Sequence, residues 1–138
     1  MARKAMLPAR IDAETFRRLD RHAKRLGKPR SNLVERYVAE GLRMDEHPGI
    51  VFVEGPAGRR PAVRRGPDVW EVIATLHDNA GDVAETAKVL DITEGDVRLA
   101  LAYYADHRAE IDDWIRANDE EGKRIASAIK RQAEASRR

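Results

Sequence analysis

The sequence contains no cysteine, only seven aromatic residues and no long hydrophobic run. Without cysteine the chain has no disulfide framework, no cysteine-based zinc site and no thiol nucleophile. The longest apolar run, residues 99–105, is far shorter than the roughly 20 residues that span a bilayer, and the N-terminus lacks the apolar core of a signal peptide. Together with 36% charged residues, these absences predict a small, charge-rich, mainly helical protein of the cytoplasm.

Signatures of metal binding and catalysis are also scarce. The four histidines are scattered along the chain and form no HExxH pair: His22, His47, His77 and His107. We therefore expect neither a metal ion nor a cofactor. A hydrolase or nuclease would need carboxylates with histidine support, or a serine in a GxSxG motif. The candidate carboxylates are expected on one exposed helix without such support: Asp106, Glu110, Asp112 and Asp113. We therefore predict a binding protein and not an enzyme.

The net charge of +2 hides a strong segregation along the chain. Residues 1–30 hold ten basic and three acidic residues, residues 67–122 hold four and fifteen, and residues 123–138 hold six and one. Lys and Arg side chains that neutralise phosphates release counterions, so a basic N-terminal block is typical of a nucleic-acid contact. The acidic middle repels the same polyanion, and we expect DNA contact to be confined to the first block or shared with the last.

The first module covers residues 3–44. Residues 3–11 alternate in polarity and predict a short strand. Asp12 is a good N-cap for a helix that ends at Gly27, and a second amphipathic helix begins with Pro29. One strand and two short helices bury too little surface to fold alone, so we expect dimerisation to be part of the fold.

The segment LPARIDAETFRRLDRHAKRLGKPRSNLVERYVAEGLR resembles the ribbon-helix-helix family, the Arc/MetJ/CopG type of bacterial repressor. It contains the strand, both helices and the glycine-containing turn of that family. The resemblance implies that two strands pair antiparallel and enter the major groove of DNA, where alternate side chains contact base edges. It also implies that a phosphate binds at the start of the second helix, where free backbone N–H groups and the helix dipole meet an anion.

Alternation along the strand places four side chains on the outward, DNA-facing side: Lys4, Met6, Pro8 and Arg10. Arg10 is the best candidate for reading a base, because a guanidinium donates two hydrogen bonds to guanine, whereas Lys4 suits a phosphate and Met6 a thymine methyl. Pro8 fits only if the outward residues are the non-hydrogen-bonded set of the antiparallel pair. The candidates for phosphate contact at the start of the second helix are Arg30, Ser31 and Asn32.

The second module covers residues 47–108. His47-Pro48-Gly49 ends the preceding helix, and residues 50–63 predict a β-hairpin around a turn rich in glycine and proline. Three short helices are expected to follow, each after a capping residue: Asp68, Asp82, and Thr93 with Asp96 in a capping box. Three helices joined by tight turns form a helix-turn-helix-like bundle.

The third helix of this bundle is more acidic than basic, which does not suit DNA reading. We interpret the bundle as a protein-interaction or dimer-stabilising module; sensing a ligand is an open alternative. The stretches HPGIVF, GRRPAVRRGPDVWEVI and ITEGDVRLALAYYADHRAEID resemble a small helix-turn-helix-like bacterial domain of unknown function. The resemblance implies a VapB-like antitoxin that acts on a PIN-like toxin nuclease. The chain has Arg65-Gly66-Pro67 where that family has a Gly-Thr-Arg-like turn.

The tail, residues 109–138, predicts a thin amphipathic helix with Gly122 as a kink. An amphipathic helix without intramolecular cover is typical of a partner-binding segment, and arginine suits the clustered carboxylates of a PIN-like nuclease. The candidate toxin-binding residues are Ile111, Trp114, Ile115, Ile125, Ile129 and Arg131. A solvated end, or a helix packed on the second module, is the alternative.

The sequence as a whole predicts a mainly α protein. It combines an N-terminal ribbon-helix-helix dimer, a three-helix helix-turn-helix-like bundle with a short β-hairpin, and a C-terminal helical tail. The predicted function is that of an antitoxin in a type II toxin-antitoxin pair, which binds operator DNA as a homodimer and neutralises a PIN-like nuclease. The alternative is a stand-alone ribbon-helix-helix repressor, and the pairing of dimers into tetramers is left open.

Overall fold

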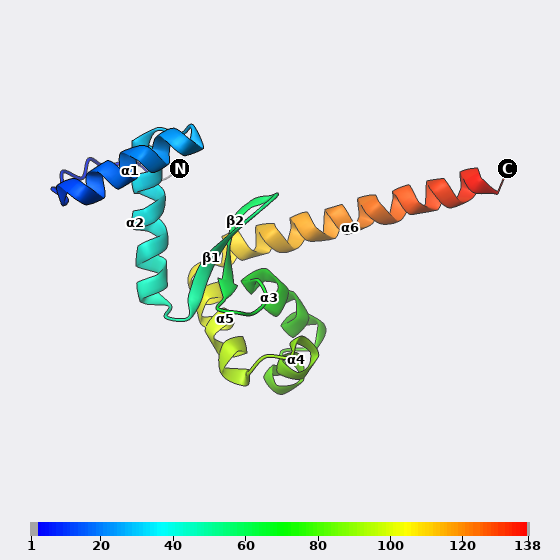
Figure 1. Cartoon of the computed structure of the whole chain (residues 1–138). Helices are drawn as coiled ribbons and strands as arrows, with labels where there is room; N and C mark the ends of the chain where they lie inside the picture. Colours follow the sequence, from blue (N-terminus) through cyan, green and yellow to red (C-terminus); the bar gives the residue numbers. More distant parts are fainter. Residues whose placement is uncertain (1–2, 138) are drawn as a thin grey trace. The chain divides into compact units, whose positions relative to one another are not determined.

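The computed structural model describes residues 3–137, which form six helices and one two-stranded sheet (Figure 1). In chain order the elements are α1 (Ala13–Leu26), α2 (Arg30–Glu46), β1 (Ile50–Gly55), β2 (Gly58–Val63), α3 (Val69–Asp78), α4 (Val83–Leu90), α5 (Glu94–Asp106) and α6 (Arg108–Ser136). The chain divides into two compact units, Met1–Leu42 and Arg43–Arg138, and the division falls inside α2.

The first unit contains α1 and most of α2. The Asp12 carboxylate accepts hydrogen bonds from the backbone N–H groups of Glu14 and Thr15 at 3.1 and 3.2 Å, and Gly27 ends α1 in the left-handed conformation with φ of 64°. Both caps are as predicted. Helix α2 begins at Arg30, one residue later than expected, and residues 3–12 lie outside any helix or strand. A strand needs a second strand to complete its hydrogen bonds, so one chain does not form the expected ribbon.

In the second unit, the predicted hairpin follows the end of α2. Strands β1 and β2 pair antiparallel with Ile50 opposite Val63 and Gly55 opposite Gly58. The buried residues of β2 lie at its end, next to the core. The hairpin therefore covers one side of the helical bundle.

The three bundle helices begin and end close to the predicted positions. Asp82 accepts from the backbone N–H of Glu85 at 3.0 Å, and Thr93 and Asp96 form a capping box before α5. Asp68 lies at the N-cap of α3 but makes no capping hydrogen bond, since its carboxylate accepts from the Arg60 guanidinium and from the indole N–H of a tryptophan. Its role is to fasten β2 to α3.

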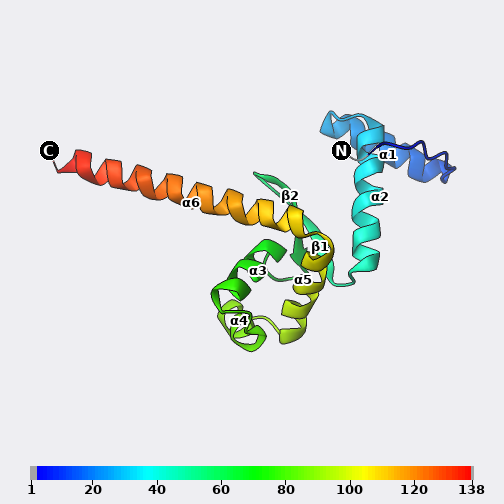
Figure 2. The ribbon, with the colours of Figure 1, turned by 180° about the vertical axis from the view of Figure 1, so that it is seen from behind.

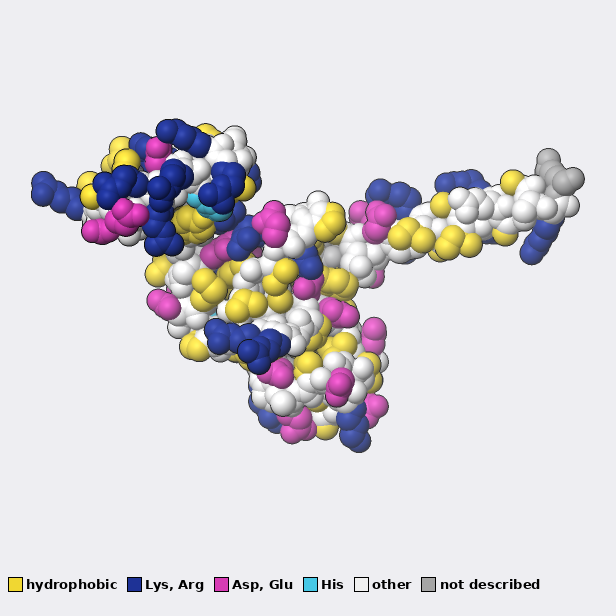
Figure 3. Space-filling model, in the orientation of Figure 1, with side chains coloured by type: hydrophobic (Ala, Val, Ile, Leu, Met, Phe, Trp, Pro, Cys, Tyr) yellow, Lys and Arg dark blue, Asp and Glu magenta, His cyan; other side chains and the backbone are white. Residues whose placement is uncertain are grey.

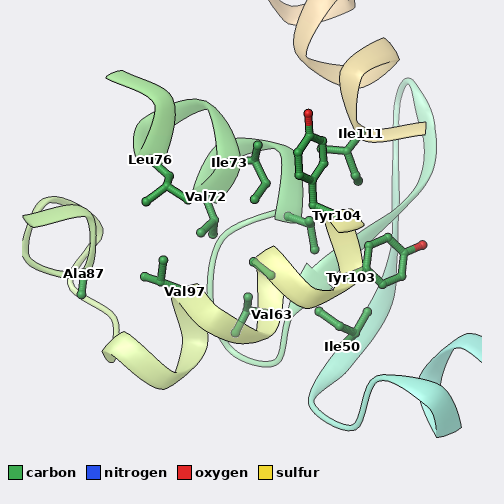
Figure 4. Packing of buried hydrophobic residues seen from close by; sticks show 12 residues of the cluster. Ile50, Val63, Val72, Ile73, Leu76, Ala87, Val97, Tyr103, Tyr104 and Ile111 are labelled. Carbon is green, nitrogen blue, oxygen red and sulfur yellow. The ribbon is translucent and has the colours of Figure 1, made fainter. Parts of the chain in front are cut away.

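A single hydrophobic core joins the hairpin to α3, α4, α5 and the start of α6 (Figure 4). Ile50 and Val63 reach it from the hairpin, and Tyr103, Val97 and Ile73 reach it from the helices. The core of the first unit is much smaller, because its only buried hydrophobic residues among those described are Ala23 and Leu33.

Helix α6 is one continuous helix through Gly122, so the expected kink does not form. Its first turns pack against α3 and α5, and Ile111 has no exposed surface. Figures 1 and 2 show that its second half extends away from the rest of the second unit. Residue 109 is therefore not the start of a separate segment. Within residues 3–137, no helix has the length and apolar content needed to cross a bilayer.

An isoleucine-to-alanine substitution should affect stability differently in the two halves of α6. We expect Ile111→Ala to lower the free energy of unfolding by about 3 kcal/mol, because it leaves a cavity in the core. Ile125→Ala, on a side chain that is 52% exposed, is the matched control and should change it by less than about 0.5 kcal/mol. Urea unfolding followed by tryptophan fluorescence measures both, and equal losses would show that Ile111 is not a core residue in solution.

Candidate nucleic-acid interface

The N-terminal segment places the predicted base-reading residues in solvent. Met6 is 91% exposed, and Pro8 and Arg10 are also exposed. Lys4 donates to Glu35 of α2 at 3.1 Å, but both side chains remain largely exposed, so the pair contributes little stability. Arg10 makes no ion pair with any described residue. Of the predicted DNA-facing residues, Arg10 therefore offers a guanidinium with no ion pair to a described residue, and Lys4 offers a lightly held ammonium group.

The same segment also carries apolar side chains that the first unit leaves uncovered. A groove of about 620 Å³ is lined by the N-terminal segment, α1 and α2. Its apolar lining residues are Ile11, Leu19, Val34, Tyr37 and Val38, and its arginines are Arg18, Arg21 and Arg25. Val38 and Tyr37 are 43% and 44% exposed, which is unusual for the inner stripe of an amphipathic helix. The groove is where a second copy is expected to pack.

The start of α2 keeps two of its three predicted phosphate contacts available. Ser31 and Asn32 are exposed in the first turn, where the backbone N–H of Asn32 already donates to the Pro29 carbonyl at 3.1 Å. Arg30 instead donates to Asp20 of α1 at 2.9 Å, and its guanidinium lies 4.6 Å from the centre of the Phe16 ring. The side chain thus links α2 to α1 in the single chain, and its expected phosphate contact stays a prediction.

Asp20 accounts for the position of Arg30. Its carboxylate accepts from Lys24 and from Arg30, and these two cations hold the pKa of Asp20 below its usual value.

Basic side chains crowd the surface of the first unit in Figure 3. Those that make no ion pair within the described chain include Arg10, Arg18 and Arg25.

The predicted toxin-binding residues separate into two groups. Ile111 is fully buried and Ile115 packs against the same core, so the partner contact expected for them does not fit: they hold α6 on its own unit. Trp114 is half-buried. Ile125 and Ile129 are 52% and 60% exposed on the extended half of α6, where Arg131 is also exposed.

The predicted carboxylate cluster is dispersed over ion pairs and hydrogen bonds. Asp106 belongs to α5 and the other three belong to α6, so they do not share one helix. Asp106 lies 3.0 Å from the imidazole of His47, although the angle between them does not form a hydrogen bond. Asp112 accepts from the Tyr104 hydroxyl at 2.7 Å, and Asp113 pairs with Arg116. No group of three or more histidine, aspartate or glutamate side chains suited to a metal ion occurs in residues 3–137.

Sequence reasoning missed a polar network around the end of α2. The Arg43 guanidinium donates to the Tyr103 hydroxyl at 3.0 Å and to Glu110, and the Tyr103 hydroxyl donates to Glu110 at 3.0 Å. Burial and the neighbouring carboxylate raise the pKa of Tyr103. The partners lie 60 and 67 residues from Arg43, so no local pattern pointed to them. The network lies within the second unit and links Arg43 to α5 and α6.

His107 lies beside this network, with its ring against that of Tyr103, and we expect it to make stability depend on pH. Burial and, after it, the positive charge of Arg43 lower the pKa of His107 below its usual 6.5. Below that pH the unfolded chain binds more protons, so the free energy of unfolding falls as the pH drops, by at most about 1.4 kcal/mol per pH unit. We expect His107→Gln to flatten this fall in urea titrations between about pH 8 and pH 5. His77→Gln, on an exposed histidine, should leave it unchanged; equal flattening by both would contradict the assignment.

Comparison with known proteins identified a similarity for the N-terminal part of the chain. The family model described as "Ribbon-helix-helix protein, copG family" matches residues 7–43, which include the end of the N-terminal segment, α1 and most of α2. The match supports a ribbon-helix-helix module at the N-terminus and does not extend to the hairpin or the bundle. No curated protein and no solved structure matches the chain.

Proposed function

We propose that the protein is a transcription regulator that binds operator DNA as a homodimer through residues 3–44. The observation that carries the proposal is the uncovered groove of the first unit, which lies within the segment matched by the ribbon-helix-helix family. A second copy that fills the groove would bring two N-terminal segments together as an antiparallel ribbon.

The ribbon would then present its outward side chains to the major groove of DNA. Arg10 would donate two hydrogen bonds to a guanine, while Met6 would contact a thymine methyl and Lys4 a phosphate. Ser31 and Asn32, with the N-terminus of α2, would hold a second phosphate on either side of the ribbon. Pro8 would occupy a non-hydrogen-bonded position of the pair.

We further propose that the protein is the antitoxin of a type II pair and neutralises a PIN-like nuclease with the end of α6. Support comes from the exposed Ile125 and Ile129 and from Arg131, whose guanidinium makes no ion pair within residues 3–137. An arginine placed among the clustered carboxylates of such a nuclease would occupy its metal site. Trp114 would extend the contact toward the bundle.

Affinity capture from native lysate, followed by mass spectrometry, tests this role. The baits are the full chain, a chain truncated after Asn118, and two full-length variants, Ile129→Asp and Val53→Asp. Val53 is an exposed hydrophobic residue of β1 and provides the matched control. We expect the full chain and Val53→Asp to retain a small nuclease, and the other two baits to lose it. The purified nuclease should regain ribonuclease activity when the protein is removed.

A different outcome identifies the alternative function. If all four baits bind DNA and recover no nuclease, the protein is a stand-alone repressor and the end of α6 has another partner. DNA binding by the homodimer is unaffected by that result, because it depends on the first unit.

A further inference from the structure

The second unit carries an acidic surface whose charges are not neutralised within the chain. Glu85 on α4, Asp91 after it and Glu94 at the start of α5 are exposed, and none of them makes an ion pair with a described residue. Two exposed hydrophobic side chains accompany them on the same helices: Val89 is 59% exposed and Leu101 is 39% exposed. The same helices also carry the exposed Lys88 and Arg98, but residues 82–98 hold five acidic and two basic residues, so this α4–α5 surface is net acidic and partly apolar.

The end of α6 has the complementary character. Residues 123–137 contain five basic residues and one acidic residue, and Lys123, Lys130 and Arg131 make no ion pair within the described chain. Ile125 and Ile129 are four residues apart and so lie on one face of the helix. Figure 3 shows hydrophobic side chains along one side of this extension, with basic side chains around them.

The two surfaces do not meet within one chain. Helix α6 is unbroken over 29 residues, and its extended half points away from α4 and α5 in both Figure 1 and Figure 2. With a rise of about 1.5 Å per residue, the 20 or so residues beyond the core extend roughly 30 Å into solvent. Only another molecule can bring an acidic α4–α5 surface to this helix end.

We propose that residues 123–137 of one copy dock on the α4–α5 surface of a second copy. The contact is reciprocal, because two copies related by a twofold axis each offer one helix end and one acidic surface. The proposed homodimer holds the two copies together, so docking is effectively intramolecular and needs little intrinsic affinity. The inference uses that homodimer but not the nuclease, which would compete with the second copy for Ile125 and Ile129.

Cysteine cross-linking tests the docking directly, because the chain has no native cysteine. Arg131→Cys is combined in turn with Glu85→Cys, Asp91→Cys or Glu94→Cys, and the full-length double variants are oxidised gently. We expect a covalent dimer whose disulfide peptide joins position 131 to one of the three acidic positions. Each single-cysteine variant should give no such dimer.

Charge reversal then asks whether charge guides the contact. In the variant with cysteines at positions 94 and 131, Lys123→Glu with Lys130→Glu should abolish the cross-link. Adding Glu85→Lys with Asp91→Lys to that same variant should restore it. Reversal of Arg64 and Arg65, an exposed basic pair elsewhere on the unit, is the matched control and should have no effect.

The outcomes separate this proposal from the proposed homodimer. A protein that is dimeric by light scattering but gives no disulfide between position 131 and the acidic surface overturns the docking alone. A disulfide that joins position 131 to its own copy in the partner means that the α6 helices pair with each other, and it also overturns the docking. A monomer by light scattering contradicts the homodimer itself.

Discussion

Val38→Asp should convert the protein from a dimer into a monomer. Val38 lines the groove of the first unit and is 43% exposed in a single chain, so a second copy would bury it. The dimer would then bury two carboxylates without partners, one from each copy. We expect a loss of about 4 kcal/mol or more, which raises the dissociation constant of the dimer roughly a thousandfold. Light scattering across a dilution series measures the change.

Val53→Asp is the control for this prediction. Val53 lies on β1 of the second unit, is 37% exposed and receives the same charge. It should leave the protein dimeric, and circular dichroism should show that the second unit keeps its helices in both variants. A Val38→Asp protein that remains dimeric at low concentration would contradict packing of the two copies through this groove.

Arg10→Ala should weaken binding to operator DNA and reduce the preference for it over unrelated DNA. A good pair of hydrogen bonds between arginine and guanine contributes about 1–3 kcal/mol of discrimination, so we expect a loss of roughly 5- to 150-fold in operator affinity. Arg10 suits this role because it is exposed and makes no ion pair with a described residue. Fluorescence anisotropy with the protein's own promoter region and with a scrambled duplex measures both affinities.

Two further variants distinguish base reading from general attraction. Ser31→Ala should weaken binding to both duplexes equally, because a phosphate contact carries no sequence information. Arg65→Ala removes an exposed arginine of the second unit and should change neither affinity. If Arg10→Ala lowers both affinities by the same factor, Arg10 contacts phosphate and not a base.

The sequence predicted well those features that depend on neighbouring residues. The caps at Asp12, Gly27 and Thr93 were predicted because a cap involves residues within one turn of each other. Asp68 is an exception: its position is that of a cap, but its carboxylate accepts hydrogen bonds from Arg60 and Trp70. The Arg60 guanidinium, eight residues away, and the Trp70 indole, two residues away, bind the carboxylate in place of the backbone N–H groups of α3.

The candidate sites were predicted less completely, for the same physical reason. Alternation along the N-terminal segment indicated which side chains face outward, but not that Arg30 would pair with Asp20 on another helix. Helical spacing marked both Ile111 and Ile125 as apolar residues of an amphipathic tail, but spacing alone does not reveal which of them the rest of the unit covers. The Arg43, Tyr103 and Glu110 network depends on how the second unit folds.

The extended second half of α6 also determines how readily a protease cleaves the chain. Figures 1 and 2 show this segment extending away from the rest of its unit, and Gly122 lowers its intrinsic helicity by about 1 kcal/mol relative to alanine. Cleavage there follows the local helix–coil equilibrium, whereas cleavage at Ile111 requires the whole unit to unfold. Any molecule that covers Ile125 and Ile129 slows the first reaction and not the second. Limited proteolysis would thus report the occupancy of this helix, and a molecule bound there would lengthen the lifetime of the intact chain.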